Sequence, residues 1–219
     1  MQCFDCASEG VAVRAQLLLA HGAGAGSQSD FMQQIGKALC GAGITTWLFD
    51  FPYMRTVYAS GQKRPPDRAP LLIEAFHEAI RAVTTSDNYH AELGLWVGGK
   101  SMGGRMATHV VSDVAHPDCA TIPLHGAVVL GYPFHPPGKP DTLRIDHFSE
   151  SGLPVFIVQG ARDTFGSFDE VEALSLPSTV EIVWLKEGDH SFKPRKRSGI
   201  SVEQNRLAAA EHVRARLCI

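Results

Sequence analysis

Short runs of apolar residues alternate along the chain with longer segments of helical periodicity, and this alternation limits the folds open to it. The apolar runs cover residues 13–20, 44–51, 93–98, 126–130, 154–159 and 180–185. The helical segments cover residues 31–42, 71–85, 102–114, 168–174 and 202–217. Such alternation predicts a mostly parallel sheet with helices on both faces, in which ligands bind at the carboxyl ends of the strands. We expect one α/β domain over residues 1–219.

Local signals predict some helix boundaries. Asp30 is a candidate N-cap, and Gly41 and Gly43 lie near the end of the helix that follows it. Pro70 stands in the first turn of the next helical segment. Residues 52–69 are rich in Pro, Gly and Arg, and they predict a loop.

The composition excludes several classes of protein. Hydrophobic residues make up 44% of the 219, enough for a core, and the net charge of -3 gives no broad basic excess. The basic cluster at residues 193–197 predicts a solvated loop. No apolar stretch approaches the roughly 20 residues that span a bilayer, and residues 1–10 lack the pattern of a signal peptide. We expect a cytoplasmic protein without nucleic-acid or membrane partners, whose oligomeric state stays open.

The cysteines favour a reducing compartment, because their number, five, is odd. They are Cys3, Cys6, Cys40, Cys119 and Cys218. The first two form a C-x-x-C, but no second pair or nearby histidine pair accompanies it. His125, His135 and His147 likewise lack the spacing of metal ligands. We therefore expect neither a metal nor a cofactor.

The motif Gly99-Lys100-Ser101-Met102-Gly103 matches the pattern G-x-S-x-G between an apolar run and a helical segment. This is the strand–turn–helix setting that a nucleophile elbow requires, and glycines beside the serine allow so sharp a turn. A serine at a helix N-terminus also lies where the helix dipole favours developing negative charge. We interpret Ser101 as a nucleophile. The alternative is a glycine-rich turn with a capping serine.

A nucleophilic serine needs a base, and the base needs a carboxylate that orients it. After such an elbow the chain order is Ser, then Asp or Glu, then His. Asp163 comes directly after the apolar run at 154–159, and His190 follows the run at 180–185. Both therefore belong to the sheet edge at which Ser101 stands, and the three residues are predicted as a catalytic triad.

Other residues are alternatives for these two roles. Asp189 adjoins His190, but neighbouring side chains on a loop seldom face each other, and Asp169 fits a helix cap. Several other histidines could serve as the base or could instead be buried or surface residues without a catalytic role: His21, His109, His125, His135 and His147.

A loop of small residues, 20–26, follows the first apolar run and exposes backbone N–H groups. Together with the N–H of Met102, which follows the nucleophile, the N–H of Ala23 is predicted to form an oxyanion hole, with Gly24 as the second choice. The rival interpretation is a phosphate-binding loop. The spacing G-x-G-x-G matches neither nucleotide-binding motif, which disfavours this rival.

Five segments carry a family resemblance: residues 18–25, 49–54, 98–105, 131–140 and 188–192. Over nearly the whole chain the sequence resembles the α/β-hydrolase superfamily. It is similar, more narrowly, to small bacterial hydrolases related to the testis-expressed and chromatin-complex α/β-hydrolase-like proteins, for which the stretch 131–140 is the marker. The resemblance implies the triad Ser101, Asp163 and His190. It supplies no substrate, and some relatives serve as interaction subunits without proven catalysis.

The segment 132–153, where many such proteins insert a lid, has only 22 residues, and we expect an open, shallow site that suits small substrates. A cationic rim selecting an acidic substrate is one interpretation of the basic and polar residues nearby; a structural role for them is the other. The candidates are Tyr53, Arg55, Arg105, His135, Lys139, Arg144 and His147.

The predicted reaction is acyl transfer from a small-molecule ester to water through an acyl-enzyme. Two alternatives remain: a binding or scaffold protein that retains an inherited triad, and thioester or peptide cleavage by the same residues. The intact triad and both oxyanion segments argue against the first, whereas the triad does not separate ester from thioester or peptide.

Overall fold

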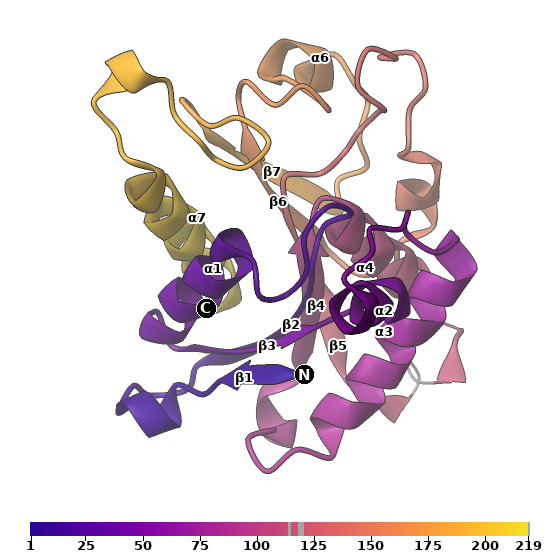
Figure 1. The fold of residues 1–219 in the computed structure, drawn as a ribbon, viewed down its shortest axis with the longest axis vertical. Helices are drawn as coiled ribbons and strands as arrows, with labels where there is room; N and C mark the ends of the chain where they lie inside the picture. Colours follow the sequence, from indigo (N-terminus) through magenta and orange to yellow (C-terminus); the bar gives the residue numbers. More distant parts are fainter. Residues whose placement is uncertain (114, 118–120, 219) are drawn as a thin grey trace.

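Within residues 1–113, 115–117 and 121–218, which the computed structural model describes, seven strands form one sheet in the order β1-β3-β2-β4-β5-β6-β7. The strands are β1 (Gln2–Phe4), β2 (Ala15–Ala20), β3 (Ile44–Phe49), β4 (Leu95–Lys100), β5 (Leu124–Leu130), β6 (Val155–Gly160) and β7 (Val180–Leu185). Only β1 runs antiparallel to its neighbour among these pairings. The carboxyl ends of β2 to β7 therefore share one edge of the sheet, at the top in Figure 1.

Helices cover both faces of the sheet, as the alternating pattern predicts (Figure 1). One face carries α1 (Asp30–Gly41) and α7 (Val202–Leu217), and the other carries α2 (Pro52–Ser60), α3 (Ala69–Thr84) and α4 (Met102–Ser112). Shorter elements lie in the connections: η1 (Ala7–Glu9), η2 (Ala91–Leu93), η3 (Asp146–Glu150), α6 (Phe168–Glu172) and η4 (Lys196–Ser198).

The two faces of β2 show why its sequence is a continuous apolar run. Leu17 and Leu19 pack with α1 and α7, whereas Leu18 and Ala20 pack into the core beneath α2, α3 and α4. All four are fully buried. Burial of a leucine side chain contributes roughly 1.5–3 kcal/mol, so a strand covered on both faces gains from every residue rather than every second one.

The loop predicted over residues 52–69 is wrong in its first half, where α2 begins at Pro52 and ends before Gly61, which has a φ of 69°. Proline fits the first turn of a helix because its missing N–H has no partner there anyway. Tyr53 and Met54 bury one side of this helix. The Pro, Gly and Arg signals thus describe residues 61–68 alone.

Smaller differences lie at the ends of elements. The N-cap of α1 is Ser29, and Asp30 is its first residue. The strand expected at 126–130 begins at Leu124, and the helix expected over 102–114 ends at Ser112, with residue 114 outside the described residues. The sequence analysis did not predict β1, a three-residue edge strand too short for a periodic pattern.

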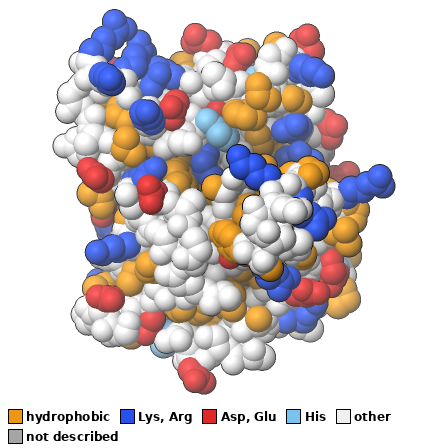
Figure 2. Space-filling model, in the orientation of Figure 1, with side chains coloured by type: hydrophobic (Ala, Val, Ile, Leu, Met, Phe, Trp, Pro, Cys, Tyr) orange, Lys and Arg blue, Asp and Glu red, His pale blue; other side chains and the backbone are white. Residues whose placement is uncertain are grey.

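The connection between β5 and β6 contains no helix longer than η3 in its described residues, which confirms that no large lid is present there. No helix in the described part of the chain has the length and apolar character needed to cross a membrane. The thiols of Cys3, Cys6, Cys40 and Cys218 are free, and Cys119 lies outside the described residues. The basic cluster at 193–197 is largely exposed, around η4, at the upper left of Figure 2.

Candidate active site

Ser101 lies in a strained turn between the last residue of β4 and the first residue of α4, with φ 52° and ψ −115°. Such a conformation costs on the order of 1–3 kcal/mol in a non-glycine residue. The flanking glycines make the turn possible. A Cβ on Gly99 would lie 2.5 Å from the Ala20 carbonyl oxygen, and one on Gly103 would lie 2.5 Å from the His21 carbonyl oxygen. The turn therefore packs its backbone directly against the end of β2.

Three side chains form a chain of hydrogen bonds at this edge of the sheet. Ser101 Oγ lies 2.8 Å from His190 Nε2, and His190 Nδ1 lies 2.7 Å from Asp163 Oδ2. The Asp163 carboxylate is fully buried, whereas the His190 side chain keeps 22% of its surface exposed. Because a carboxylate only accepts, His190 Nδ1 carries the hydrogen and Nε2 is left to accept from the serine hydroxyl.

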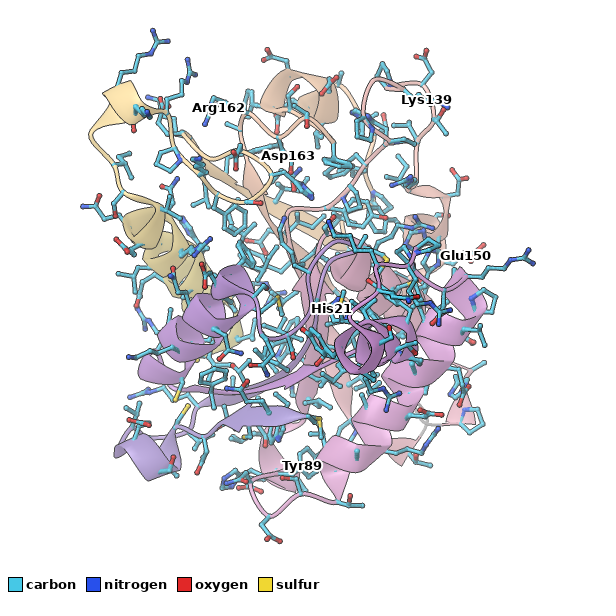
Figure 3. All side chains as sticks on the ribbon, in the orientation of Figure 1. His21, Tyr89, Lys139, Glu150, Arg162 and Asp163 are labelled. Carbon is cyan, nitrogen blue, oxygen red and sulfur yellow. The ribbon has the colours of Figure 1, made fainter. Side chains whose placement is uncertain are left out.

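Two further donors hold the Asp163 carboxylate, which Figure 3 labels above the sheet. Gln159 Nε2 donates to Oδ2 at 3.0 Å, and the Phe165 N–H donates to Oδ1 at 2.9 Å. Gln159 is the last polar residue of β6 and is fully buried. A buried amide in an otherwise apolar strand is a sequence signal for such a partner, and the sequence analysis did not use it.

The loop after β7 turns sharply to bring His190 back over the sheet. The carboxylate of Asp189 accepts from the backbone N–H groups of Ser191 and Lys193, at 2.8 and 2.9 Å, so it stabilises the turn. Phe192 is fully buried and has a φ of 64°. In this arrangement Asp163, and not Asp189, faces the histidine ring.

A pocket of about 330 Å³ lies over Ser101 and His190. Its other walls come from the loop after β2, α1, β4 and the loops after β6 and β7: Gly22, Ala23, Gly24, Ala25, Ser29, Phe31, Met32, Lys100, Phe165 and Ser191. A space of this size suits a small molecule.

The loop after β2 is held by two side chains that sequence reasoning did not assign to it. His21 Nδ1 lies 2.7 Å from the Gly22 oxygen, and Tyr53 Oη donates to the Ala23 oxygen at 3.0 Å. Because a peptide unit is planar, holding each carbonyl also orients the N–H on its opposite side, here those of Ala23 and Gly24. His21 Nε2 accepts from the Phe51 N–H, and burial lowers the pKa of the ring, so a neutral His21 donates through Nδ1.

Met102 is the first residue of α4, and the N–H groups of a helix's first turn have no partner within the helix. The N–H of Met102 therefore lies beside Ser101 with its hydrogen available. Ala23 and Gly24 line the pocket from the other side.

The candidate substrate residues do not line this pocket. Tyr53 is buried beneath the loop after β2 and holds its carbonyls. His135 is buried 3.7 Å from the Glu170 carboxylate. Lys139 is exposed on an outer loop (Figure 3). Arg105 and Arg144 meet in a separate cleft.

Lys100, the last residue of β4, is a pocket residue that no sequence signal indicated. Its ammonium donates to the His190 carbonyl oxygen and lies 5.2 Å from the ring centre of Phe31 and 5.8 Å from that of Phe192. Burial lowers the pKa of this lysine to about 8, against opposing attraction from Asp163 and Asp189. A buried ammonium thus stands behind the histidine loop.

Replacing Lys100 by methionine should raise the free energy of unfolding at pH 7 by up to about 3 kcal/mol. Below pH 8 the lysine is protonated in both states, and the folded protein bears the full cost of burying the charge. Between pH 8 and 10.5 the folded protein releases a proton that the unfolded chain keeps, so the parent's stability recovers with pH. The variant's advantage should therefore disappear by about pH 10.5.

Urea unfolding of both proteins from pH 7 to 10.5 measures this difference, with the exposed Lys186→Met as the matched control. A Lys100→Met protein less stable than the parent at pH 7 would show that the ammonium is a net stabilising group.

No group of three or more His, Cys, Asp or Glu side chains able to hold a metal ion is found within the described ranges.

Comparison with known proteins identifies related sequences and folds. A family model described as an alpha/beta hydrolase domain matches residues 13–217. A solved structure of Est1E from Butyrivibrio proteoclasticus with bound ferulic acid is similar, at 12% identity and a TM-score of 0.65, covering 94% of this chain and 91% of that one. A dienelactone hydrolase from Anabaena variabilis has 20% identity, a TM-score of 0.64 and coverages of 93% and 85%. A serine hydrolase without lid from Xanthomonas campestris has 21% identity, a TM-score of 0.59 and coverages of 95% and 85%.

Proposed function

Since the chain belongs to the alpha/beta hydrolase family, we propose that it is a serine hydrolase that cleaves a small ester or related acyl substrate. One observation carries the proposal: the continuous hydrogen-bond chain from Ser101 Oγ through His190 to the buried Asp163 carboxylate. A histidine held by a carboxylate on one nitrogen and by a serine hydroxyl on the other is the arrangement that general-base activation of a serine requires.

In the proposed mechanism Ser101 Oγ attacks the acyl carbon while His190 Nε2 accepts the hydroxyl proton. Asp163 keeps the ring in the required tautomer and stabilises the imidazolium that forms. The imidazolium then gives its proton to the departing alcohol. A water molecule then attacks the acyl carbon while the same nitrogen takes its proton. The imidazolium returns that proton to Ser101 Oγ as the bond from Oγ to the acyl group breaks, which releases the acid and restores the free serine.

The oxyanion that forms in each step is assigned to backbone N–H groups. Met102 and Ala23 are the proposed donors, with Gly24 as the second choice beside Ala23. The contacts of His21 and Tyr53 to the Gly22 and Ala23 carbonyls support this, because they hold the loop before substrate arrives. Donors oriented in advance need no reorganisation as charge develops.

The size of the pocket, about 330 Å³, and the absence of a large helical lid in the described connection from β5 to β6 favour small acyl substrates. Similar structures suggest esters and lactones as a class to test, since one of them holds ferulic acid and another is a dienelactone hydrolase. Within the family, the stretch 131–140 supports a relationship to the small bacterial hydrolases that the sequence resembles.

A fluorophosphonate probe should label the native protein at Ser101, because a serine that a histidine activates displaces fluoride from the reagent and becomes phosphonylated. Mass spectrometry of the digested protein locates the modified peptide, and prior denaturation should abolish the labelling. A panel of p-nitrophenyl esters and matched thioesters of increasing acyl length then ranks the substrates. A folded protein that neither reacts with the probe nor cleaves any member of the panel would instead indicate a binding protein with an inherited triad.

A further inference from the structure

A second cleft, of about 500 Å³, lies along α4 on the far side from α1 and α7. Arg105 and His109 of α4 form one wall, and the segment from Leu143 to Glu150 forms the other; Figure 3 labels Glu150, at the end of this segment. This cleft shares no lining residue with the pocket over Ser101. The cleft is therefore separate from the pocket over Ser101.

Two arginines meet in this cleft without a carboxylate partner. Neither Arg105 nor Arg144 has an Asp or Glu oxygen within 4.0 Å in the ion pairs of the described residues. Partial burial, and then repulsion from Arg105, lower the pKa of Arg144. Asp146 and Glu150 also line the cleft, but both are exposed at its rim. Two half-buried guanidinium groups thus lie near each other, and neither forms a direct ion pair with these carboxylates in the described residues.

The walls between the arginines are held in place rather than free to move apart. The rings of His109 and His147 stack at 3.7 Å with an angle of 20°. His147 Nε2 lies 2.8 Å from Thr108 Oγ1, and Ser112 Oγ donates to the His147 carbonyl at 3.1 Å. These bonds tie η3 to α4. Partial burial, with repulsion from His109 and Arg105, lowers the pKa of His147 to about 3, so the stacked pair adds no charge at neutral pH.

We propose that this cleft is a binding site for a small molecule bearing a dianionic group, with the guanidinium groups of Arg105 and Arg144 as its two anchors. A guanidinium donates two parallel hydrogen bonds to the oxygens of a phosphate or a carboxylate pair. A dianion neutralises both arginines at once, whereas a monoanion leaves one unpaired. Because the walls are already tied together, little ordering accompanies binding.

Leu143 adds an apolar surface to the cleft, which indicates that the ligand has an apolar part as well as a dianionic group. Its side chain is 37% exposed and lines the same cleft, so an apolar surface lies beside the two guanidinium groups. An organic phosphate or dicarboxylate, rather than a bare ion, would cover it. The inorganic dianion remains the simplest probe of the anchors.

Isothermal titration calorimetry with sodium sulfate at pH 7.5 tests the site, because sulfate carries two charges at that pH. The parent should bind one sulfate per chain, and Arg105→Gln/Arg144→Gln should weaken binding at least about tenfold. The control Arg68→Gln/Arg197→Gln removes the same charge from exposed positions and should bind within about twofold of the parent. Sodium chloride of equal ionic strength should give no saturable heat.

The proposal is overturned if the parent shows no saturable sulfate binding up to about 10 mM, the range of a weak specific site, or if both double variants lose binding equally. Single Arg144→Gln, at a surface segment, keeps the test valid should the double variant unfold. A further readout is thermal: without sulfate, Arg105→Gln/Arg144→Gln should melt no lower than the parent, because it relieves repulsion.

A last arm identifies the source of the dianion. If it is part of the acyl substrate, sulfate should raise the KM of esters that carry a terminal phosphate or carboxylate pair and leave p-nitrophenyl acetate unaffected. If it is an independent ligand, sulfate should not change the KM of either ester. Both results keep the site, and neither depends on which acyl group the enzyme prefers.

Discussion

Alanine in place of Ser101 is expected to reduce p-nitrophenyl acetate hydrolysis by on the order of 10⁴-fold or more, leaving only the residual rate that binding and the oxyanion hole support. The loss follows because Oγ is the only protein atom of the proposed mechanism that forms a bond to the acyl carbon. The backbone is already strained at this residue, with φ 52°, and alanine adds no atoms to the turn, so the fold should persist. The initial rate of p-nitrophenol release at saturating ester, followed by absorbance, gives kcat.

Two controls separate a chemical loss from a folding loss. Ser60→Ala changes an exposed serine at the end of α2 and should keep the parent's activity. The thermal midpoint of Ser101→Ala should match or exceed that of the parent, because active-site groups are seldom placed for stability. Hydrolysis by Ser101→Ala at the parent's rate would exclude a serine nucleophile at this position.

Asparagine in place of Asp163 should lower kcat by about 10⁴-fold while leaving KM within a few fold, as an orienting carboxylate's loss does in other triads. The amide can present its NH₂ to His190 Nδ1, which would move the ring hydrogen to Nε2 and leave no acceptor for the serine hydroxyl. Asp163 is fully buried and accepts from Gln159 and Phe165 as well as from the histidine. Some loss of stability should therefore accompany the loss of rate.

Steady-state kinetics of Asp163→Asn, compared with Asp169→Asn and Asp189→Asn, tests this role against its alternatives. Asp169 is exposed in the first turn of α6, and its variant should keep the parent's kcat. Asp189 holds two backbone N–H groups of the histidine loop, so its variant should lose stability more than rate. A large fall in kcat for Asp189→Asn, with Asp163→Asn near the parent, would assign the acid to Asp189.

The order of residues along the chain predicted much of the candidate site, because parallel strands bring the residues that follow each strand to one edge of the sheet. Ser101, Asp163 and His190 each come directly after a strand, and the structure brings them within hydrogen-bond distance. The same reasoning failed for Arg105 and Arg144. The edge of a sheet is wide, and both side chains line a cleft that shares no lining residue with the pocket over Ser101.

Residues whose role depends on a distant partner were not predictable. Tyr53 lies in α2, where the sequence predicts a loop, and its hydroxyl donates to the carbonyl of Ala23, 30 residues away in the chain. Lys100 stands next to the serine in the motif, yet only the approach of the histidine loop, 90 residues away, makes it a buried cation.

The sequence by itself determined most of the strands and helices, though not β1 or α2, together with the α/β class, the sharp turn at Ser101 and the set of candidate partners. These features depend on hydrophobic period, on glycines where a Cβ would clash and on chain order, all of which are local or topological. The tertiary structure alone decided which walls enclose Ser101, that Lys100 is buried behind His190, and that Arg105 and Arg144 share a cleft of their own. The reason is physical: which loops lie side by side at a sheet edge follows from strand order and packing, and short-range patterns contain neither.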